Sequence, residues 1–285
     1  MPEMRNRFKF NFKIKMPLVF ASICPHPPLI IPTIGKPNDL KLVAKTIRAM
    51  EELAKIFKET KTGTVILISP HGPFQPDQFI INQSPTLTGN FYNFGDVETE
   101  LFFKNDQNFL KEIETETKNA KIPLGKVNIE EIDHGSLVPL YYLRKSKLDF
   151  KIVPLAFSLL DFKTHFAFGK AIQKAIINYC TIRANSTIGI VASGDLSHRL
   201  TLDAPAGYSP RGKEFDEKLI ELIGKKDVKG ILNLDPDLIE DAGECGFRSI
   251  LILLGALDGL NWQPEILSYE GPFGVGYSVI NFKIK

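Results

Sequence analysis

Short apolar runs alternate along the chain with segments in which apolar residues recur at the spacing of a helix. The apolar runs predict β-strands, and several are apolar at every position, as expected where helices cover both faces of a sheet. The longer periodic segments predict amphipathic helices. The predicted strands are Leu18–Ile23, Thr64–Ser69, Phe150–Ser158, Thr187–Ser193, Glu265–Ser268 and Tyr277–Phe282. The predicted helices are Asp39–Lys58, Glu98–Thr117, Leu137–Leu143, Lys163–Tyr179, Gly212–Ile223 and Phe247–Ala256.

This alternation predicts an α/β fold, a three-layer α/β/α single domain with a central mixed sheet. The sheet is expected to be mixed because the last two predicted strands are joined by a short turn, which favours an antiparallel pair. Neither a linker-like composition nor a repeat of solenoid length interrupts the chain. Residues 16–285 are therefore expected to form one domain.

The first fifteen residues differ from the rest of the chain. From Arg7 to Lys15, apolar residues alternate strictly with polar or basic ones, which is the period of a strand. The segment lacks the apolar stretch of a signal peptide, and Met16 offers a second start. Residues 1–15 are therefore expected to be an N-terminal extension outside the domain.

Composition is that of an ordinary globular protein, with 44% hydrophobic residues, 24% charged residues and a net charge of +2. So small a net charge gives no reason to expect nucleic acid as a partner. The longest apolar runs, such as Ile250–Leu254 and Val65–Ile68, are too short to span a bilayer, and no membrane association is expected. The three cysteines lack CxxC spacing, which indicates neither a disulfide framework nor a structural zinc cluster, and a cytoplasmic location is expected.

Four of the five histidines lie in turn-like segments beside regular elements. His26, His71 and His198 each follow a predicted strand, and His134 precedes a predicted helix. Because ligands of α/β sheets bind beyond the carboxyl ends of the strands, these histidines are expected to converge on one crevice. His165 lies at the start of an amphipathic helix and is expected to be structural or exposed.

A converging set of histidines indicates a metal site. Neutral imidazole binds iron, zinc or copper, and two histidines with one carboxylate form the facial triad of non-haem Fe(II) oxygenases. The polar segment 240–246 offers the carboxylate, and Glu244 is preferred because Gly243 and Gly246 bracket it and permit a close turn. Cys245 stays open as an alternative ligand, because a thiolate binds soft metals well.

The segments that carry these residues resemble those of a known superfamily. From Pro17 to the C-terminus the chain is similar to the catalytic subunit of class III extradiol ring-cleavage dioxygenases (LigB-like), in the Memo-like, AmmeMemoRadiSam-associated branch. The joint occurrence of the segments in this order is more specific than any one of them. The segments are Cys24–Pro27, Ser69–Gly72, Asp133–Gly135 with Val138–Leu140, Ser193–His198 and Gly243–Gly246.

The resemblance implies a role for each candidate residue. His26 and His71 match the two metal-binding histidines of the family. His198 matches the histidine that acts as general base and acid beside the metal, and His134 matches a pocket histidine that contacts substrate or bound oxygen. Glu244 falls where the dioxygenases supply the carboxylate.

The third ligand separates the functions that the resemblance implies. With Glu244, the chain is expected to be an Fe(II)-dependent extradiol-type dioxygenase that acts on a catechol-like aromatic substrate. Cys245 equally matches the cysteine–glycine pair of Memo-like relatives, which implies a metal-binding or redox protein without ring-cleavage activity. A zinc-dependent enzyme that uses the same site also stays open, as does copper as the metal.

The same resemblance bears on the neighbours of the site residues and on the partners of the protein. Asp195 and Ser69 are expected to orient the imidazoles. The expected partners are a small aromatic substrate and dioxygen, whereas self-association and a partner protein both stay open.

Overall fold

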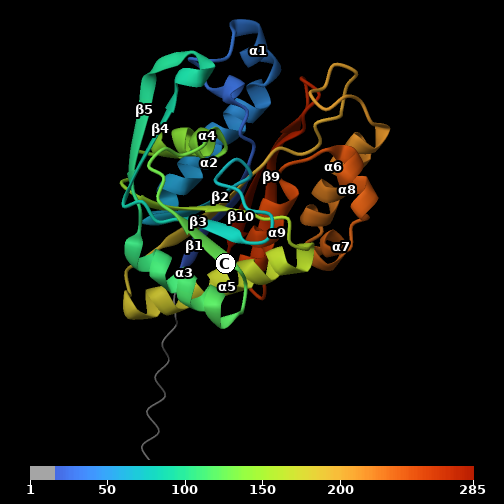
Figure 1. Ribbon diagram of the computed structural model, residues 1–285. Helices are drawn as coiled ribbons and strands as arrows, with labels where there is room; N and C mark the ends of the chain where they lie inside the picture. Colours follow the sequence, from blue (N-terminus) through green and yellow to red (C-terminus); the bar gives the residue numbers. More distant parts are fainter. Residues whose placement is uncertain (1–16) are drawn as a thin grey trace, which may run out of the picture.

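A mixed sheet of eight strands runs through the middle of the molecule (Figure 1). In the order in which they lie side by side, its strands are β6 (Leu124–Val127), β3 (Phe79–Asn82), β7 (Lys151–Ala156), β2 (Thr64–Ser69), β8 (Ile188–Ser193), β1 (Leu18–Cys24), β10 (Tyr277–Ile284) and β9 (Trp262–Glu270). The central strands β7, β2, β8 and β1 are parallel, whereas β10 and β9 form an antiparallel pair at one edge. The predicted antiparallel pair at the end of the chain is therefore confirmed.

The computed structural model describes residues 17–285. The expected extension, residues 1–15, and its boundary at residue 16 lie outside the described residues. Within residues 17–285, no helix combines the length and the apolar character that crossing a bilayer requires.

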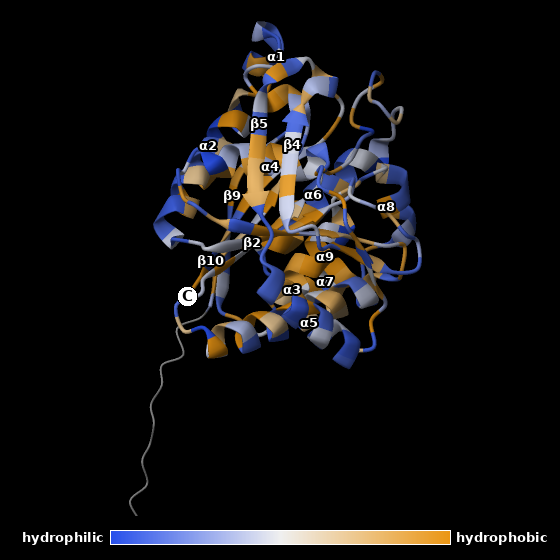
Figure 2. Ribbon diagram, turned by 60° about the vertical axis from the view of Figure 1, so that its left-hand side comes forward, coloured by the Kyte–Doolittle hydropathy of each residue, from blue (hydrophilic) through white to orange (hydrophobic). Residues whose placement is uncertain are grey.

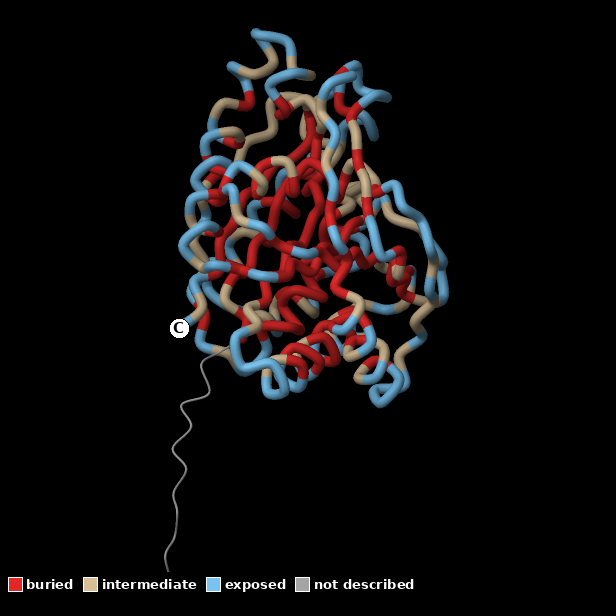
Figure 3. The backbone as a smooth tube through the Cα atoms, turned by 90° about the vertical axis from the view of Figure 1, so that its left-hand side faces the viewer, coloured by how far each residue is buried: buried red, intermediate tan, exposed pale blue. Residues whose placement is uncertain are grey.

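Helices cover both faces of the sheet (Figures 1 and 2). On one face lie α2 (Ala44–Thr60) and α4 (His134–Arg144), and on the other α3 (Gln107–Asn119), α5 (Phe162–Ile182) and α9 (Phe247–Ala256). The remaining helices are α1 (Pro37–Leu42), α6 (Pro210–Gly224), α7 (Val228–Leu232) and α8 (Pro236–Ala242), with 3-10 turns η1 (Pro28–Ile30) and η2 (Tyr92–Phe94). β2 and β8 are buried at every position, as Figure 3 also shows for the centre of the molecule, which explains their continuous apolar sequence. The predicted three-layer α/β/α domain is confirmed.

The predicted helix Glu98–Thr117 is wrong in its first part. Asp96–Lys104 forms strand β5, which pairs antiparallel with β4 (Thr86–Phe91) in a separate hairpin. Asp106 caps α3 by accepting a hydrogen bond from the N–H of Phe109, so the helix begins only after this residue. Acidic residues alternate with Thr and Leu in β5, which is the period of a strand. The strand was included in the predicted helix because the helical spacing of α3 follows it directly.

Helices α5 and α9 touch backbone to backbone at Gly169 and Gly255. A Cβ atom at Gly169 would collide with the main-chain oxygen of Ile252, and one at Gly255 with that of Phe166. Any larger residue would push α9 away from α5. This contact therefore fixes the position of the segment just before α9, which contains Cys245.

Asp96 fastens the β4–β5 hairpin to the loop before α1. Its carboxylate accepts hydrogen bonds from Thr33 Oγ1 at 2.5 Å and from the N–H groups of Glu98 and Thr99 at 3.0 and 2.9 Å. Although burial opposes its ionisation, these hydrogen bonds lower the pKa of Asp96 to about 2. The ionised carboxylate is therefore stabilised by the fold.

We expect Asp96→Asn to reduce the free energy of unfolding by about 1–3 kcal/mol at neutral pH. The folded pKa lies below the unfolded value of about 3.9, so the stabilisation is complete above that value and is lost as the pH falls toward 2. Urea denaturation of both proteins between pH 7 and pH 3 should therefore show a shrinking difference. Asp77→Asn, at an exposed position, is the control. A difference that stays constant over this range would contradict the assignment.

Candidate metal centre

The candidate residues meet at the edge of the sheet where the parallel strands β1, β8 and β2 end. His26 and His71 each lie two residues past their strand, β1 and β2, and His198 lies in the segment after β8. Cys24 at the end of β1 pairs with Ser193 at the end of β8, so the two strands end at the same height. Residues far apart in the sequence are thereby brought to one place.

The rings of three predicted histidines form one cluster. The ring centroids of His26 and His71 are 4.8 Å apart, and those of His71 and His134 are 4.3 Å apart in a stacked arrangement. The ring of Phe94, from η2 at the tip of the hairpin, lies 5.4 Å from that of His134. The structure thus brings together the histidines that follow β1 and β2 and the one that begins α4.

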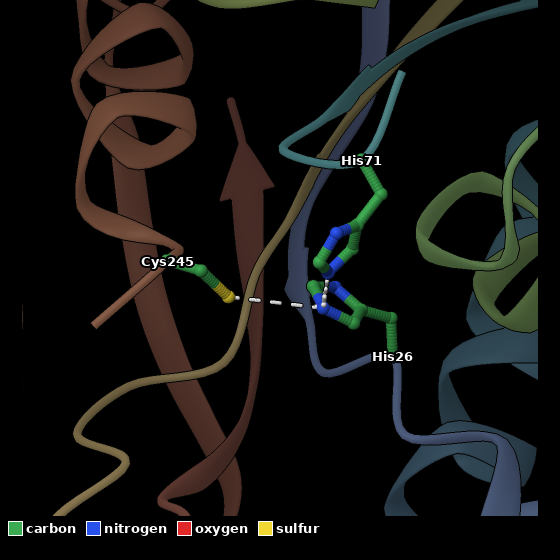
Figure 4. A group of neighbouring side chains, drawn as sticks. All are labelled: His26, His71 and Cys245. Atoms are coloured by element: carbon green, nitrogen blue, oxygen red, sulfur yellow. Dashed lines mark hydrogen bonds between the residues drawn. The ribbon is translucent and has the colours of Figure 1, made fainter. Parts of the chain in front are cut away.

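His26, His71 and Cys245 present three ligand atoms to one another (Figure 4). The Nε2 atoms of His26 and His71 are 3.0 Å apart, and Cys245 Sγ lies 3.7 Å from His26 Nε2. All three atoms lie within 4.8 Å of one another. His26 is buried, Cys245 is half-buried and His71 is exposed, so solvent reaches the group from the His71 side.

This donor set fits a metal ion. Two nitrogens bound to one ion at about 2.1 Å lie roughly 3.0–3.4 Å apart, and a nitrogen and a thiolate sulfur lie about 3.6 Å apart around a tetrahedral ion. The observed separations of 3.0 Å and 3.7 Å agree with these values. Two imidazoles and one thiolate are ligands that zinc and copper favour.

Ser193 fixes the tautomer of His26. Ser193 Oγ donates its only proton to the main-chain oxygen of Gly135 at 2.5 Å, so toward His26 Nδ1, 3.0 Å away, it acts as an acceptor. Nδ1 therefore carries the ring proton, and Nε2 presents a lone pair toward His71 and Cys245. Ser193 is not among the predicted site residues, although the sequence places it at the end of a predicted buried strand, before the loop of His198.

Asp195 holds both sides of the group. Its Oδ1 accepts a hydrogen bond from the N–H of His26 at 3.0 Å, and its own N–H donates to Cys245 Sγ at 3.2 Å. Burial raises the pKa of the Asp195 carboxyl to about 7, against the hydrogen bond from His26. Asp195 thus positions the backbone of His26 by a hydrogen bond, and its Oδ2 lies 3.9 Å from the Nε2 atom of the same ring.

Asp133 performs the same task for His71 and His134. Ser69 Oγ accepts from the N–H of His71 at 3.2 Å and donates to Asp133 Oδ1 at 2.5 Å. Asp133 also caps α4, whose first residue is His134, by accepting from Ser136 N at 2.9 Å. A sequence signal existed, because an aspartate directly before a predicted helix is a typical N-cap.

Glu244, the preferred carboxylate, does not join the group. Its Oε2 accepts a hydrogen bond from the N–H of Phe247 at 2.5 Å, which caps α9. Burial raises the pKa of this carboxyl to about 7. Adjacent side chains in the segment before α9 point in different directions, and it is Cys245, the alternative ligand, that faces His26 and His71.

His198 lies near His26 but is not one of the three residues of the group. The backbone N–H of His198 donates to the main-chain oxygen of Ala242 at 3.0 Å, which connects it to the segment that leads to Cys245. Its Nδ1 is buried and has no hydrogen-bond partner among residues 17–285. This nitrogen is therefore enclosed by protein atoms.

Burial keeps the clustered histidines neutral. The pKa of His26 lies well below its ordinary value because of burial first, and then because His71, His134 and His198 are close. Burial also lowers the pKa of each of these three neighbours. Neutral imidazole is the form that binds metal, so no proton has to be displaced from these rings at neutral pH.

His165 has a structural place, as one of the two predicted alternatives stated. It is fully buried, and its ring nitrogens lie 2.9 Å and 3.1 Å from the main-chain oxygens of Asp161 and Ser158. Burial lowers its pKa to about 4. His165 thereby secures the loop between β7 and α5.

Comparison with known proteins identifies the family to which the chain is similar. Residues 20–280 match the family described as the catalytic LigB subunit of aromatic ring-opening dioxygenase. Protein CA_C1420 of Clostridium acetobutylicum is 34% identical over 270 residues, which are 92% of this chain and 56% of that protein. A 3,4-dihydroxyphenylacetate 2,3-dioxygenase of Escherichia coli is 32% identical over 147 residues, 47% of this chain and 51% of that protein. The chain thus spans about half the length of the curated relatives it matches.

A solved structure supports the fold. The crystal structure of the uncharacterized protein JW3007 from Escherichia coli K12 is similar with a TM-score of 0.64, over 92% of this chain and 99% of that one. The two sequences are 18% identical, so the likeness concerns the fold alone.

We expect Ser193→Ala to weaken zinc binding by about 10- to 100-fold, because His26 Nδ1–H loses the acceptor that fixes its tautomer. Chelator-competition titration of the metal-free proteins with Zn(II) measures the change, and circular dichroism checks the fold. Ser278→Ala, which removes a buried hydroxyl without a hydrogen-bond partner among the described residues, is the matched control. Equal zinc affinity in all three proteins would refute the role of Ser193.

Proposed function

The chain belongs to the family of the catalytic LigB subunit of aromatic ring-opening dioxygenases, and from this membership we propose a metal-dependent oxidoreductase in which His26, His71 and Cys245 hold one metal ion. We assign residues 16–285 as the catalytic domain. The proposed substrate is a small catechol-like compound with dioxygen as the oxidant, in keeping with the family and with the dioxygenase of Escherichia coli to which part of the chain is similar.

One observation carries this proposal: Cys245 Sγ, not the Glu244 carboxylate, faces the two histidines. A thiolate with two imidazoles favours copper or zinc, whereas an Fe(II) facial triad needs a carboxylate. The N–H of Asp195 donates to Cys245 Sγ at 3.2 Å, but burial raises the pKa of the Cys245 thiol, so a metal ion would have to displace its proton. The proposal therefore favours oxidation at a thiolate site over extradiol ring cleavage.

The residues around the ion have separate tasks. A bound metal would supply positive charge that promotes ionisation of a substrate hydroxyl and, with copper, a redox couple. Ser193 would keep the His26 lone pair directed at the position of the ion, and His198 would accept the proton of that hydroxyl and return it later. The stacked rings of His71 and His134, with Phe94 beside them, offer a flat surface for an aromatic ring.

Fe(II)-dependent ring cleavage is the second candidate, and one contact favours it. Asp195 Oδ2 lies 3.9 Å from His26 Nε2, whereas the Glu244 carboxylate is engaged in capping α9. With Asp195 as the carboxylate, His26 and His71 would complete a facial triad. The family, whose description names aromatic ring-opening dioxygenase, and the similarity to a 3,4-dihydroxyphenylacetate 2,3-dioxygenase also support this candidate.

We expect Cys245→Ala to lower copper and zinc affinity on the order of a hundredfold, because one of three ligands is lost. Glu244→Gln keeps an oxygen that accepts from Phe247 and is expected to bind metal as the wild type does. Metal content after purification and anaerobic titration with Fe(II), Cu(I) and Zn(II) compare the two variants. Metal loss in Glu244→Gln with retention in Cys245→Ala would overturn the proposed ligand set.

Asp195→Asn separates the two candidate functions. If Fe(II) binding and oxygen uptake with a panel of catechols disappear in this variant while Cys245→Ala retains both, the ring-cleaving candidate is correct. The proposed thiolate site predicts instead that Asp195→Asn retains its metal and that Cys245→Ala loses it.

We expect His198→Ala to keep its metal and to lose about a hundred- to ten-thousand-fold in turnover, because the general base is removed. Metal content by mass spectrometry and oxygen uptake with catechols are the two measurements. Tyr208→Phe, at an exposed position, is the control. Loss of the metal in His198→Ala would make His198 a ligand.

A further inference from the structure

A cavity of about 410 Å³ opens at the edge of the sheet where the parallel strands begin, opposite the metal centre. Gly63, directly before β2, and Phe150, directly before β7, belong to its lining, whereas His71 follows the other end of β2. Helix α4 connects the two places, because it begins at His134 in the histidine cluster and ends at Arg144 in the cavity wall. Its 11 residues span roughly 16 Å, so the cavity is separate from the metal centre.

Cations outnumber carboxylates in the lining of this cavity. Lys104 at the end of β5, Arg144 at the end of α4 and Lys151 at the start of β7 line it together with one acid, Asp149, so three positive charges and one negative charge give a formal charge of +2. Among the three cations, only Lys151 has a carboxylate within ion-pair distance in residues 17–285, that of Asp106 at 4.0 Å. Such a lining attracts an anion. A phosphate monoester, with a charge of about −1.5 to −2 at neutral pH, balances it better than a single carboxylate does.

Arg144 is held in the cavity wall without an acidic partner. Its Cζ atom lies 5.3 Å from the ring centroid of Phe103 and 5.8 Å from that of Phe150. Its guanidinium forms no ion pair within the described part of the chain, whereas the next residue, Lys145, pairs with Glu51 at 3.3 Å. The negative partial charge at the end of α4 favours a cation here but provides no carboxylate for it. Two rings thus orient a guanidinium that is available to an anion from outside the chain.

The cavity also offers an apolar surface to a flat group. Phe102 lines it and is 59% exposed, although its side chain is large and apolar. A planar base in the cavity can cover this ring, and every base has a face that stacks on an aromatic side chain. The Asp149 carboxylate lies in the same lining and can accept hydrogen bonds from the hydroxyl groups of a ribose. The lining thus combines groups that recognise the phosphate, the base and the sugar of a nucleotide.

We propose that this cavity binds a mononucleotide, with the phosphate at Lys104, Arg144 and Lys151 and the base against Phe102. A guanidinium pairs with a phosphate through two parallel hydrogen bonds, which gives Arg144 the largest share. The volume of about 410 Å³ lies within the range of small-molecule sites, about 300–1,000 Å³. The site goes beyond the proposed function, since none of its lining residues belongs to the group of His26, His71 and Cys245.

The test compares three probes by titration calorimetry of the full chain: adenosine monophosphate (AMP), adenosine and inorganic phosphate. AMP should bind at least about tenfold more tightly than either of the others, because each of them lacks one of the recognised parts. Arg144→Gln should weaken AMP binding by about tenfold or more, and Lys104→Gln, at an exposed position, by a smaller factor. Phe102→Ala should weaken AMP binding roughly five- to hundredfold and leave phosphate binding unchanged.

The matched control is Lys145→Gln. Lys145 is also a cation at the end of α4 that lies over an aromatic ring, with its Nζ 4.7 Å from the Tyr142 centroid, but it does not line the cavity. This variant should bind AMP as the wild type does. Circular dichroism checks the fold of every variant. If Arg144→Gln fails to fold, Lys104→Gln and Phe102→Ala, both at exposed positions, decide the question.

Cys245→Ala separates this site from the metal centre. The variant is expected to lose its metal and should still bind AMP with the affinity of the wild type, so the two sites are tested independently. Loss of AMP binding in Cys245→Ala, with binding retained in Arg144→Gln, would assign the nucleotide to the metal centre and overturn the proposal. Equal affinities for AMP and phosphate, or an AMP affinity that Phe102→Ala leaves unchanged, would also overturn it.

Discussion

The site depends on the register of the parallel strands β1, β8 and β2, which makes their carboxyl ends level with one another at one edge of the sheet. Cys24 pairs with Ser193, and Ile68 pairs with Ala192, so the loops after these strands start side by side. A shift of one residue in β8 would turn Ser193 to the other face of the sheet and remove the acceptor that fixes the His26 tautomer. The geometry of the site is therefore set by the register of the strands, whose last residues contact His26 and His71.

Cys245 is positioned by main-chain contacts of its neighbour Gly246. Gly246 packs directly on Gly194, because a Cβ atom at Gly194 would collide with the Gly246 backbone. The N–H of Gly246 also donates a hydrogen bond to the main-chain oxygen of Asp195 at 3.0 Å. The close contact of α5 and α9 holds this segment against the sheet. Main-chain contacts thus fasten the segment before α9 to the loop after β8 and to α5.

Features that repeat along the chain could be predicted from the sequence, whereas features set by tertiary contact could not. The buried strands and the clustering of His26, His71 and His134 belong to the first kind, because strand ends in an α/β sheet share one edge. Elements such as β3, β6 and α7 are four or five residues long, too short for a period to be recognised. The choice between Glu244 and Cys245 depends on the left-handed backbone of Gly243, with φ of 60°, and on the packing of the next helix, neither of which a local pattern contains.

The network around Asp133 has a mechanical consequence. A single carboxylate connects to the His71 loop through Ser69 and also terminates α4 at His134, so the two stacked rings share one support. Loss of the Asp133 carboxylate would therefore disturb the His71 loop and the first turn of α4 together, so the positions of both rings depend on one side chain.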